Sequence, residues 1–448
     1  MPVDPKIFKA YDIRGIYPQE LNQEAAFDIG RALVQYLNCD RVAVGRDMRS
    51  SSEPLFRAFA EGATGQGAEV VDLGLISTDG LYFAVGRFGY PAGVMITASH
   101  NPKEYNGFKI CKKDAVPLSG EEGLFQIRDI INGGGLRPGG AKGRIVSQDI
   151  DSAYNEFCLS FIDSQKIWGY RIAVDAGNGM AGKTVPPLFQ RLPGELIELY
   201  FDLDGTFPNH PASPIEPENI AELQRVVVER KCDFGVAFDG DADRMFLIDE
   251  KGTALAGSDV AALVSKMLLK KHPGATIVYN AICSRCVKET IEKHGGRAVR
   301  SRVGHALIKP LMRQENAVFG GEHSGHFYFR DFWFADSGLL AFLVCWQLIS
   351  EEDKPLSRLV AEVDPYVRIP ETNSRVNDIP GKLAELEAIY SQKGAELDKL
   401  DGLTISYPDW WANVRPSNTE PLLRLNVEAR DRDLLEEKSK ELLEIIRG

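Results

Sequence analysis

The sequence has little that would place the protein in a membrane or in an oxidising compartment. Its seven cysteines are odd in number and scattered over 448 residues, which is not typical of a disulfide framework. The longest apolar run, Leu339–Trp346, is far shorter than the roughly 20 residues of a membrane-spanning helix. Met1–Ala10 shows no apolar core of a signal peptide. We therefore expect a cytoplasmic protein with no membrane span.

Positive charge is also in short supply. The 52 Lys and Arg residues face 64 Asp and Glu residues, for a net charge of −12, which is unfavourable for binding nucleic acid or an anionic membrane. A phosphate-bearing ligand would therefore need a local concentration of arginine or lysine. The sequence is silent on oligomeric state, for which we expect a monomer or a weak homodimer.

The chain is too long for a single core, and one pattern occurs in it three times. In each copy an apolar strand is followed by a helix, a second strand, and a third strand that runs into a polar loop. From about Val367 onward, shorter strands at 404–407 and 422–427 and a helix at 433–447 indicate a smaller unit. The strands expected in the three copies are 41–45, 68–72 and 93–97; 171–175, 195–199 and 233–239; and 276–279, 297–300 and 317–319.

The predicted fold class is α/β, with three similar mixed α/β domains and a smaller C-terminal α+β domain around a central cleft. In such folds, ligands bind beyond the carboxyl ends of the strands. The loops after the third strands, at 98–106, 240–244 and 320–326, are therefore the candidate sites. We place the domains at 1–150, 151–254, 255–366 and 367–448.

The first of these loops presents Ser99 in the run Thr97-Ala-Ser-His-Asn-Pro102. Pro102 keeps the loop from continuing directly into a helix. A serine hydroxyl is a weak nucleophile without a base or a metal, but it can carry a phosphoryl group. Taken alone, Ser99 next to His100 is more often an ordinary polar turn than a catalytic site.

The second loop places three carboxylates, Asp239, Asp241 and Asp243, at alternate positions before Arg244. Crowded oxygen ligands suit Mg²⁺, and without a cation the three charges would repel one another. Arg244 either holds a phosphate beside the metal or forms a salt bridge with these aspartates. The competing interpretation is a calcium-binding EF-hand loop that ends at Glu250, but the expected flanks are strands, and Arg244 stands where that loop needs glycine.

The third loop offers groups that suit a sugar. Its glycines let the backbone approach a ligand, and Glu322, Ser324 and His326 are candidate substrate-binding side chains. Taken alone, a structural glycine turn is equally consistent with these residues.

A fourth loop has the composition of an anion-binding turn. Arg415 precedes three small donors that lie between two prolines, and Arg424 emerges from the following strand. The alternative is a solvated hairpin. The candidate phosphate ligands are Arg415, Ser417, Asn418, Thr419 and Arg424.

Two weaker features remain open. Cys283 and Cys286 have the spacing of a redox pair or half of a zinc site, but no second pair of cysteines exists, and we interpret them as incidental. His305 is either a proton shuttle or an exposed loop histidine, and spacing alone does not decide.

Taken in order, the four loops resemble the four signature motifs of the α-D-phosphohexomutase superfamily, over essentially the whole chain. Thr97-Ala-Ser-His-Asn and Tyr105-Asn-Gly-Phe-Lys109 are similar to its bacterial phosphomannomutase/phosphoglucomutase branch. The resemblance implies a phosphoglucomutase-type fold and a phosphoserine at Ser99. It further implies a metal bound by Ser99, Asp239, Asp241 and Asp243, sugar hydroxyls bound by Glu322 and Ser324, and a substrate phosphate bound by Arg415, Ser417, Asn418 and Thr419.

Other segments match the same family. Lys9–Gly15 implies that Tyr11 and Arg14 line the cleft. The candidates for the general acid and base are Lys109, His100 and His305. Arg244 is also counted among the catalytic residues. Ile282 stands about where bifunctional members are expected to have a lysine, with Arg285 nearby, which leaves the phosphate contacts of the third domain open.

The implied activity is interconversion of hexose 1-phosphate and hexose 6-phosphate, of mannose and/or glucose, through phosphoserine and a 1,6-bisphosphate intermediate. The expected cofactors are Mg²⁺ and, as activator, glucose 1,6-bisphosphate or mannose 1,6-bisphosphate. The alternatives are a phosphoglucosamine mutase, in which we expect Gln in place of His323, a sugar phosphatase that uses Asp239 and Asp241, and a non-catalytic sugar-phosphate-binding protein.

Overall fold

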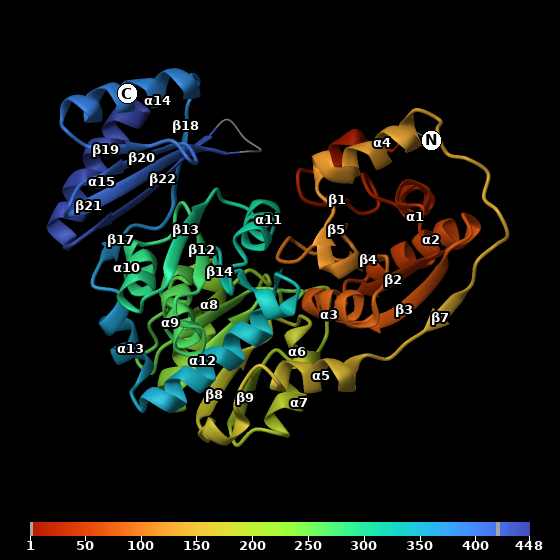
Figure 1. The fold of residues 1–448 in the computed structure, drawn as a ribbon, viewed down its shortest axis with the longest axis horizontal. Helices are drawn as coiled ribbons and strands as arrows, with labels where there is room; N and C mark the ends of the chain where they lie inside the picture. The colour runs from red at the N-terminus through yellow and green to blue at the C-terminus, as the bar shows by residue number, and fades with distance from the viewer. Residues whose placement is uncertain (1–2, 418–421) are drawn as a thin grey trace.

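The computed structural model describes residues 3–417 and 422–448, apart from the side chain of His305. Four β-sheets follow one another along the chain (Figure 1). The first three belong to mixed α/β units and the fourth to a smaller α+β unit, as the sequence predicts. Each predicted domain contains one sheet, and the boundaries between the domains stay predictions.

Four consecutive strands have the same arrangement in each of the first three sheets. The third, first and second strands lie side by side and parallel, and the fourth pairs antiparallel with the third. This confirms the threefold repeat. The strands are β2 (Arg41–Arg46), β3 (Glu69–Leu75), β4 (Ala92–Ile96) and β5 (Tyr105–Lys112); β8 (Arg171–Asp175), β9 (Glu195–Leu199), β10 (Phe234–Phe238) and β11 (Met245–Ile248); and β12 (Thr276–Asn280), β13 (Arg297–Ser301), β14 (Phe319–Gly321) and β15 (Phe327–Phe329).

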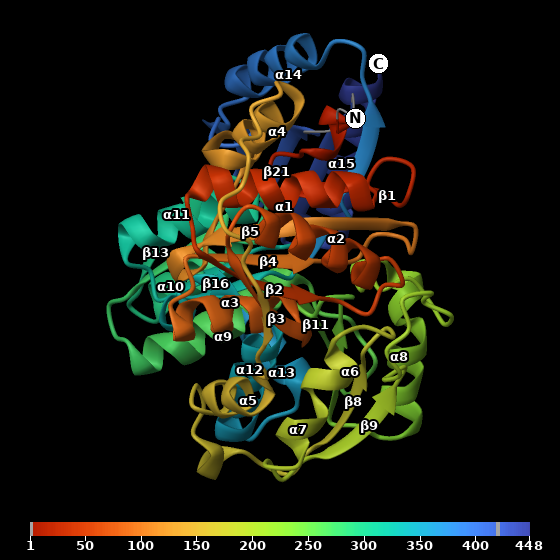
Figure 2. The same ribbon diagram turned by 90° about the vertical axis from the view of Figure 1, so that its right-hand side faces the viewer.

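The first sheet is extended at both edges and covered by helices. Asn22 and Ser77 accept hydrogen bonds from backbone N–H groups and so cap α1 and α3. Figure 2 shows α1 and α2 crossing the same face of this sheet. The additional elements are β1 (Ile13–Ile16), β6 (Val116–Pro117), β7 (Ile145–Ser147), α1 (Gln23–Leu37), α2 (Ser52–Gly65), α3 (Thr78–Phe88) and α4 (Phe125–Asn132).

One helix joins the second and third units. The apolar run Leu339–Trp346 lies in α12, which is buried from Gly338 to Ser350 and contacts α5 and β11 of the second unit as well as α9 of the third. The helices of these units are α5 (Asp151–Leu159), α6 (Ala181–Thr184), α7 (Pro186–Phe189), α8 (Pro217–Glu229), α9 (Gly257–Lys271), α10 (Arg285–Lys293), α11 (His305–Glu315), α12 (Gly338–Glu352) and α13 (Leu356–Val363); β16 (Ala335–Asp336) completes the third sheet.

One strand lies later in the chain than the sequence predicts. The third strand of the third unit was expected at 317–319, whereas β14 spans Phe319–Gly321. Gly320 and Gly321 belong to the strand because they pair with Val278 and Tyr279 of β12. Only glycine fits there, because an added Cβ would meet Met312 at 2.5 Å or Ala261 at 2.7 Å. The third loop therefore begins at Glu322.

The fourth unit is an antiparallel sheet with two helices. Leu423, Leu425 and Val427 are all buried on one face of β22, as predicted. Among the described residues, no helix of this or any other unit is long and apolar enough to cross a membrane. The elements are β17 (Val367–Arg368), β18 (Thr372–Arg375), β19 (Glu396–Asp398), β20 (Leu403–Ser406), β21 (Trp410–Pro416), β22 (Leu422–Ala429), α14 (Ile379–Gln392) and α15 (Arg432–Arg447).

A substitution at Gly86 tests the packing between the first and third units. A Cβ at Gly86 on α3 would lie 2.2 Å from the Trp333 indole, whereas a Cβ at Gly65 on α2 would meet nothing within 4 Å. We expect Gly86→Ala to destabilise the protein by about 1 to 3 kcal/mol through overpacking. Gly65→Ala, the matched control, should stabilise it by roughly 0.5 kcal/mol. Urea unfolding measures both, and an unchanged midpoint for Gly86→Ala would contradict this account of the interface.

Candidate functional site

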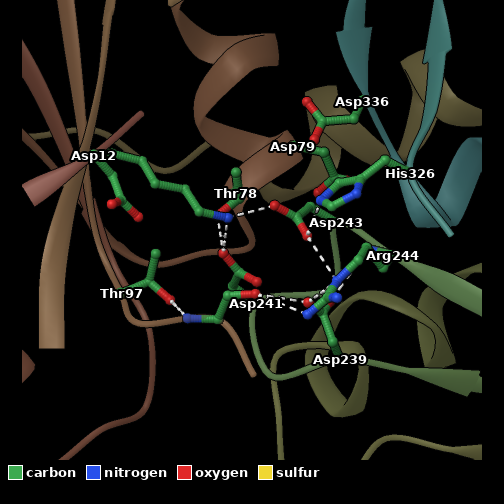
Figure 3. A network of polar contacts seen from close by, with 12 residues as sticks. Asp12, Thr78, Asp79, Thr97, Asp239, Asp241, Asp243, Arg244, His326 and Asp336 are labelled. Carbon is green, nitrogen blue, oxygen red and sulfur yellow. Dashed lines mark hydrogen bonds and ion pairs between the residues drawn. The ribbon is translucent and has the colours of Figure 1, made fainter. Parts of the chain in front are cut away.

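The repeated topology brings the three predicted loops together. The loops after β4, β10 and β14 are equivalent, and each leads into the antiparallel fourth strand of its sheet. Figure 3 shows Thr78 and Thr97 of the first unit beside the aspartates of the second loop, with His326 of the third loop nearby. The backbones of the second and third loops also pair directly, through a bridge between Arg244 and His326.

Ser99 lies in the left-handed backbone region, with φ of 50°, and is only 4% exposed. The Thr97 hydroxyl accepts a hydrogen bond from the Ser99 N–H at 2.9 Å. Ser99 Oγ donates to Asp239 Oδ2 at 2.7 Å, and Arg244 Nη2 lies 3.4 Å from the same hydroxyl. The nucleophile candidate is therefore already in contact with the aspartate loop of the second unit.

Arg49 holds the serine loop, although sequence reasoning did not identify it. Its guanidinium donates to the backbone carbonyls of Ser99, Asn101, Pro102 and Tyr105, at distances from 2.6 to 3.0 Å. Arg49 is buried, and Asp47 lies 3.3 Å from its Nε. A single arginine after a strand is a weak sequence signal, because only the folded loop brings four carbonyls to it.

The three aspartates are buried, and one ligand oxygen of each lies within 4.8 Å of the other two. Lys109 Nζ donates to Asp241 Oδ2 at 2.7 Å and also to Asp243, while Arg244 Nε donates to Asp239 Oδ2 at 2.9 Å. Three carboxylates thus face two cations. Asp241 Oδ1 and Asp243 Oδ1 are buried and have no hydrogen-bond partner among the described residues, so the donor set fits Mg²⁺.

The pKa values of the basic groups follow from this charge. Burial alone would lower the pKa of Lys109, but Asp241 and Asp243 outweigh it and raise that pKa, so Lys109 is a cation at neutral pH. Arg244, with burial adding to its effect, holds the pKa of His100 well below its usual range. His100 is therefore neutral, and its Nδ1 lies 3.2 Å from Ser99 Oγ.

Asp239, the acidic group nearest the serine, has a raised pKa. Burial raises the pKa of Asp239 to about 7, and the charges of Asp243 and Asp241 add to the effect although Arg244 opposes it.

Thr78, at the start of α3, donates from its hydroxyl to Asp241 Oδ2 at 2.5 Å. Sequence reasoning missed Thr78 because its hydroxyl meets the aspartate loop only after the first two units dock.

The third loop is held by its neighbours in the third unit. The Glu322 carboxylate is 1% exposed and accepts hydrogen bonds from Asn280 Nδ2 at 3.0 Å, from Gly304 N at 3.1 Å and from the Tyr328 hydroxyl. Ser324 Oγ lies 3.0 Å from His326 Nδ1. His326 Nε2 is 3.9 Å from Asp243 Oδ1, which brings this loop to the aspartates.

A cavity of about 230 Å³ lies among these groups. Predicted residues from the first three units line this cavity, whereas Glu322, Ser324 and Arg415 do not. Asp12, Tyr82 and Asp336 are lining residues that the sequence did not reveal. The lining is Tyr11, Asp12, Arg14, Tyr82, Ser99, His100, Lys109, Asp243, Arg244, His326 and Asp336.

Arg14 and Tyr11 both line this cavity. Arg14 Nη1 donates to Asn101 Oδ1 at 2.6 Å and so contacts the serine loop. The Tyr11 hydroxyl lies beside Gly304, where an added Cβ would be 2.9 Å from it. The side chain of His305 lies outside the described part of the structure.

The fourth loop is described in part. Arg415 on β21 and Arg424 on β22 lie directly opposite each other, and Arg424 Nη2 is 3.4 Å from Ser417 Oγ. Asn418 and Thr419 lie outside the described residues. The predicted phosphate ligands that are described therefore do lie together.

Comparison with known proteins covers nearly the whole chain. Models of the phosphoglucomutase/phosphomannomutase alpha/beta/alpha domains I, II and III match residues 5–137, 151–252 and 256–366, and that of the C-terminal domain matches residues 371–445. The chain belongs to the phosphoglucomutase/phosphomannomutase family.

The names of relatives in this family support the expected enzyme class, a phosphohexomutase. A protein named phosphohexose mutases, from Xanthomonas campestris pv. campestris, is 40% identical and covers 98% of this chain and 99% of its own. A phosphomannomutase of Salmonella montevideo is 38% identical over 98% of both chains. The solved structure of a family protein from Burkholderia thailandensis has a TM-score of 0.89 at 32% identity, over 98% of this chain and 96% of that one. The expected enzyme class, a phosphohexomutase, is confirmed.

Three open interpretations can be compared with the structure of this phosphohexomutase. The aspartate loop is no EF-hand, because β10 and β11 flank it and Glu250 accepts a hydrogen bond from Ser357 N at 3.1 Å instead. Cys283 and Cys286 are buried, and burial raises the pKa of both thiols, which suits incidental cysteines. Arg285 donates to carbonyls of Tyr407 and Trp410 in the fourth unit, at 2.5 and 3.0 Å.

Replacing Arg49 tests how the serine loop is held. The ammonium of Arg49→Lys has a single nitrogen and cannot reach four carbonyls. We therefore expect the free energy of opening the loop to fall by at least about 2 kcal/mol. Hydrogen exchange of the backbone amides at 98–106 should therefore become faster. Arg57→Lys, exposed on α2, is the matched control. Unchanged exchange in Arg49→Lys would show that the loop is held by other contacts.

His323 gives a pH-dependent stability. Burial, with Arg368 adding to it, lowers the pKa of His323 to about 4 from 6.5. As the pH falls below 6.5, the unfolded chain binds a proton that the native ring does not, so stability is lost. Because the ring is partly exposed, we expect wild type to lose only about 1 kcal/mol more than His323→Gln between pH 8 and pH 5. Urea unfolding at both pH values measures this, and a wild type that gains stability relative to the variant would contradict it.

Proposed function

We propose that the protein interconverts hexose 1-phosphate and hexose 6-phosphate, with mannose and glucose phosphates as substrates, through a phosphorylated Ser99 and a 1,6-bisphosphate intermediate. The observation that carries the proposal is the contact of Ser99 Oγ with Asp239, at 2.7 Å, and with Arg244, at 3.4 Å. A serine that served only as a turn residue would not need a buried carboxylate and a guanidinium beside its hydroxyl.

Asp239, Asp241 and Asp243, with the phosphoryl group on Ser99, would hold Mg²⁺. When bound, this ion supplies charge neutralisation for the transferring phosphoryl group. Arg244 is placed to share that task through its contact with Ser99 Oγ, because a guanidinium pairs well with phosphate oxygens. Burial would lower the pKa of Lys109, but Asp241 and Asp243 raise it and favour the charged form.

The transfer itself moves one proton. The bond between phosphorus and Ser99 Oγ breaks, a bond between phosphorus and a sugar oxygen forms, and the proton of the sugar hydroxyl leaves while Ser99 Oγ gains one. His100, whose Nδ1 lies 3.2 Å from Ser99 Oγ, is within reach of this proton. The reverse transfer from the other end of the bisphosphate restores the phosphoserine.

The remaining predicted residues would hold the substrate. Glu322 and Ser324 would bind sugar hydroxyls in both orientations, and Arg415 with Ser417, Asn418 and Thr419 would bind the phosphate that is not reacting. Few sugar contacts of this kind suit a substrate that turns over between the two transfers. The cytoplasmic location, the absence of nucleic-acid partners and the monomer or weak homodimer stay predictions.

A coupled mutase assay tests this function. Wild type with Mg²⁺ and catalytic glucose 1,6-bisphosphate should isomerise mannose 1-phosphate and glucose 1-phosphate without releasing phosphate, and chelation of Mg²⁺ should abolish the activity. We expect Ser99→Ala to lose about 10³-fold or more, while Ser391→Ala, exposed on α14, remains fully active. Phosphate release that survives Ser99→Ala would instead indicate a sugar phosphatase. Activity confined to glucosamine phosphate would indicate a phosphoglucosamine mutase.

A further inference from the structure

Arg415 and Arg424 are direct cross-strand partners in the fourth sheet. Like charges directly opposite each other destabilise an antiparallel pair. The Arg415 side chain is 9% exposed and that of Arg424 is 32% exposed, so water screens the repulsion incompletely. The arrangement therefore needs a negative charge close to both guanidinium groups.

Glu371 supplies this charge from the segment between β17 and β18. Its Oε2 accepts hydrogen bonds from Arg415 Nη2 at 3.0 Å and from Asn426 Nδ2 at 3.1 Å, and its Oε1 accepts from Arg424 Nη1 at 3.0 Å. Burial works to raise the pKa of Glu371, but Arg415, Asn426 and Arg424 outweigh burial and lower it. The carboxylate is therefore charged at neutral pH.

The backbone keeps Glu371 in this position from both sides. The next residues, Thr372 and Asn373, pair with Leu425 and Arg424 of β22. The preceding strand, Val367–Arg368, pairs farther along β22. Glu371 is thus fixed to the strand that carries Arg424.

We propose that Glu371 is a positioning residue that holds the guanidinium groups of Arg415 and Arg424 side by side as the subsite for the non-reacting phosphate. The inference rests on the proposed function above. Glu371 occupies one Nη of each arginine. Two guanidinium groups against one carboxylate leave net positive charge for a phosphate dianion.

Kinetics of Glu371→Gln test the proposal. The substitution removes the negative charge of Glu371. It also replaces one carboxylate oxygen with an amide NH2 group, a donor that faces two arginines. The non-reacting phosphate is held equally in the ground state and the transition state, so a damaged subsite raises KM and leaves kcat almost unchanged. We expect KM for hexose 1-phosphate to rise about tenfold, equivalent to about 1.4 kcal/mol, while kcat changes by less than about twofold.

Two further variants sharpen the test. Glu371→Asp keeps the charge on a shorter side chain and should raise KM about threefold. Glu436→Gln, exposed on α15, is the matched control and should leave both constants unchanged. A KM that is unchanged or lower in Glu371→Gln would overturn the proposal, and a lower value would mean that Glu371 competes with the phosphate. If Glu371→Gln does not fold, Glu371→Asp decides by the same criterion.

Binding of inorganic phosphate separates this proposal from the proposed function. Calorimetry on wild type and Glu371→Gln measures the subsite without any turnover. Weaker phosphate binding by Glu371→Gln would support the positioning role even if wild type showed no mutase activity, whereas equal binding would overturn it. A wild type that binds phosphate but isomerises no hexose phosphate would defeat the proposed function alone.

Discussion

The buried charge of Asp239, Asp241 and Asp243 is the constraint on which the site depends. Three carboxylates removed from water carry a large desolvation penalty unless cations or donors meet them. Lys109 of the first unit and Arg244 of the second provide the positive charge, and the hydroxyl of Thr78 donates from the start of α3. These contacts hold the first two units together at the site. The negative charge that remains suits a cation that binds oxygen ligands.

The threefold topology explains how such a site arises from distant segments. In each of the first three sheets, the third strand ends at an equivalent loop. The same architecture thus presents Ser99 in one copy, the aspartates in the second and His326 in the third. Since their backbones are similarly placed, the difference in chemistry between the loops comes from a few side chains. Two charged side chains hold other groups of the site in place: Arg49 donates to carbonyls of the serine loop, and Glu371 accepts from Arg415 and Arg424.

The sequence predicted much of this because its signals are contiguous. The strands at 171–175 and 195–199 appear with the predicted bounds, and the motifs around Ser99, Asp239 and Arg415 are each contained in a few residues. The prediction was wrong at β14, where packing against Met312 and Ala261 favours glycine within a strand. Local pattern cannot reveal this, because glycine by itself indicates a turn.

The sequence alone therefore determined the fold class, the order of the units and the chemical type of each loop, since strand periodicity and short motifs are properties of neighbouring residues. Only the tertiary structure decided which groups face one another. The pairs Ser99 with Asp239, Lys109 with Asp241, and Glu371 with Arg415 join residues far apart in the chain. Their contacts and pKa shifts depend on how the sheets dock and on how much water that docking excludes, and neither is a property of any single segment.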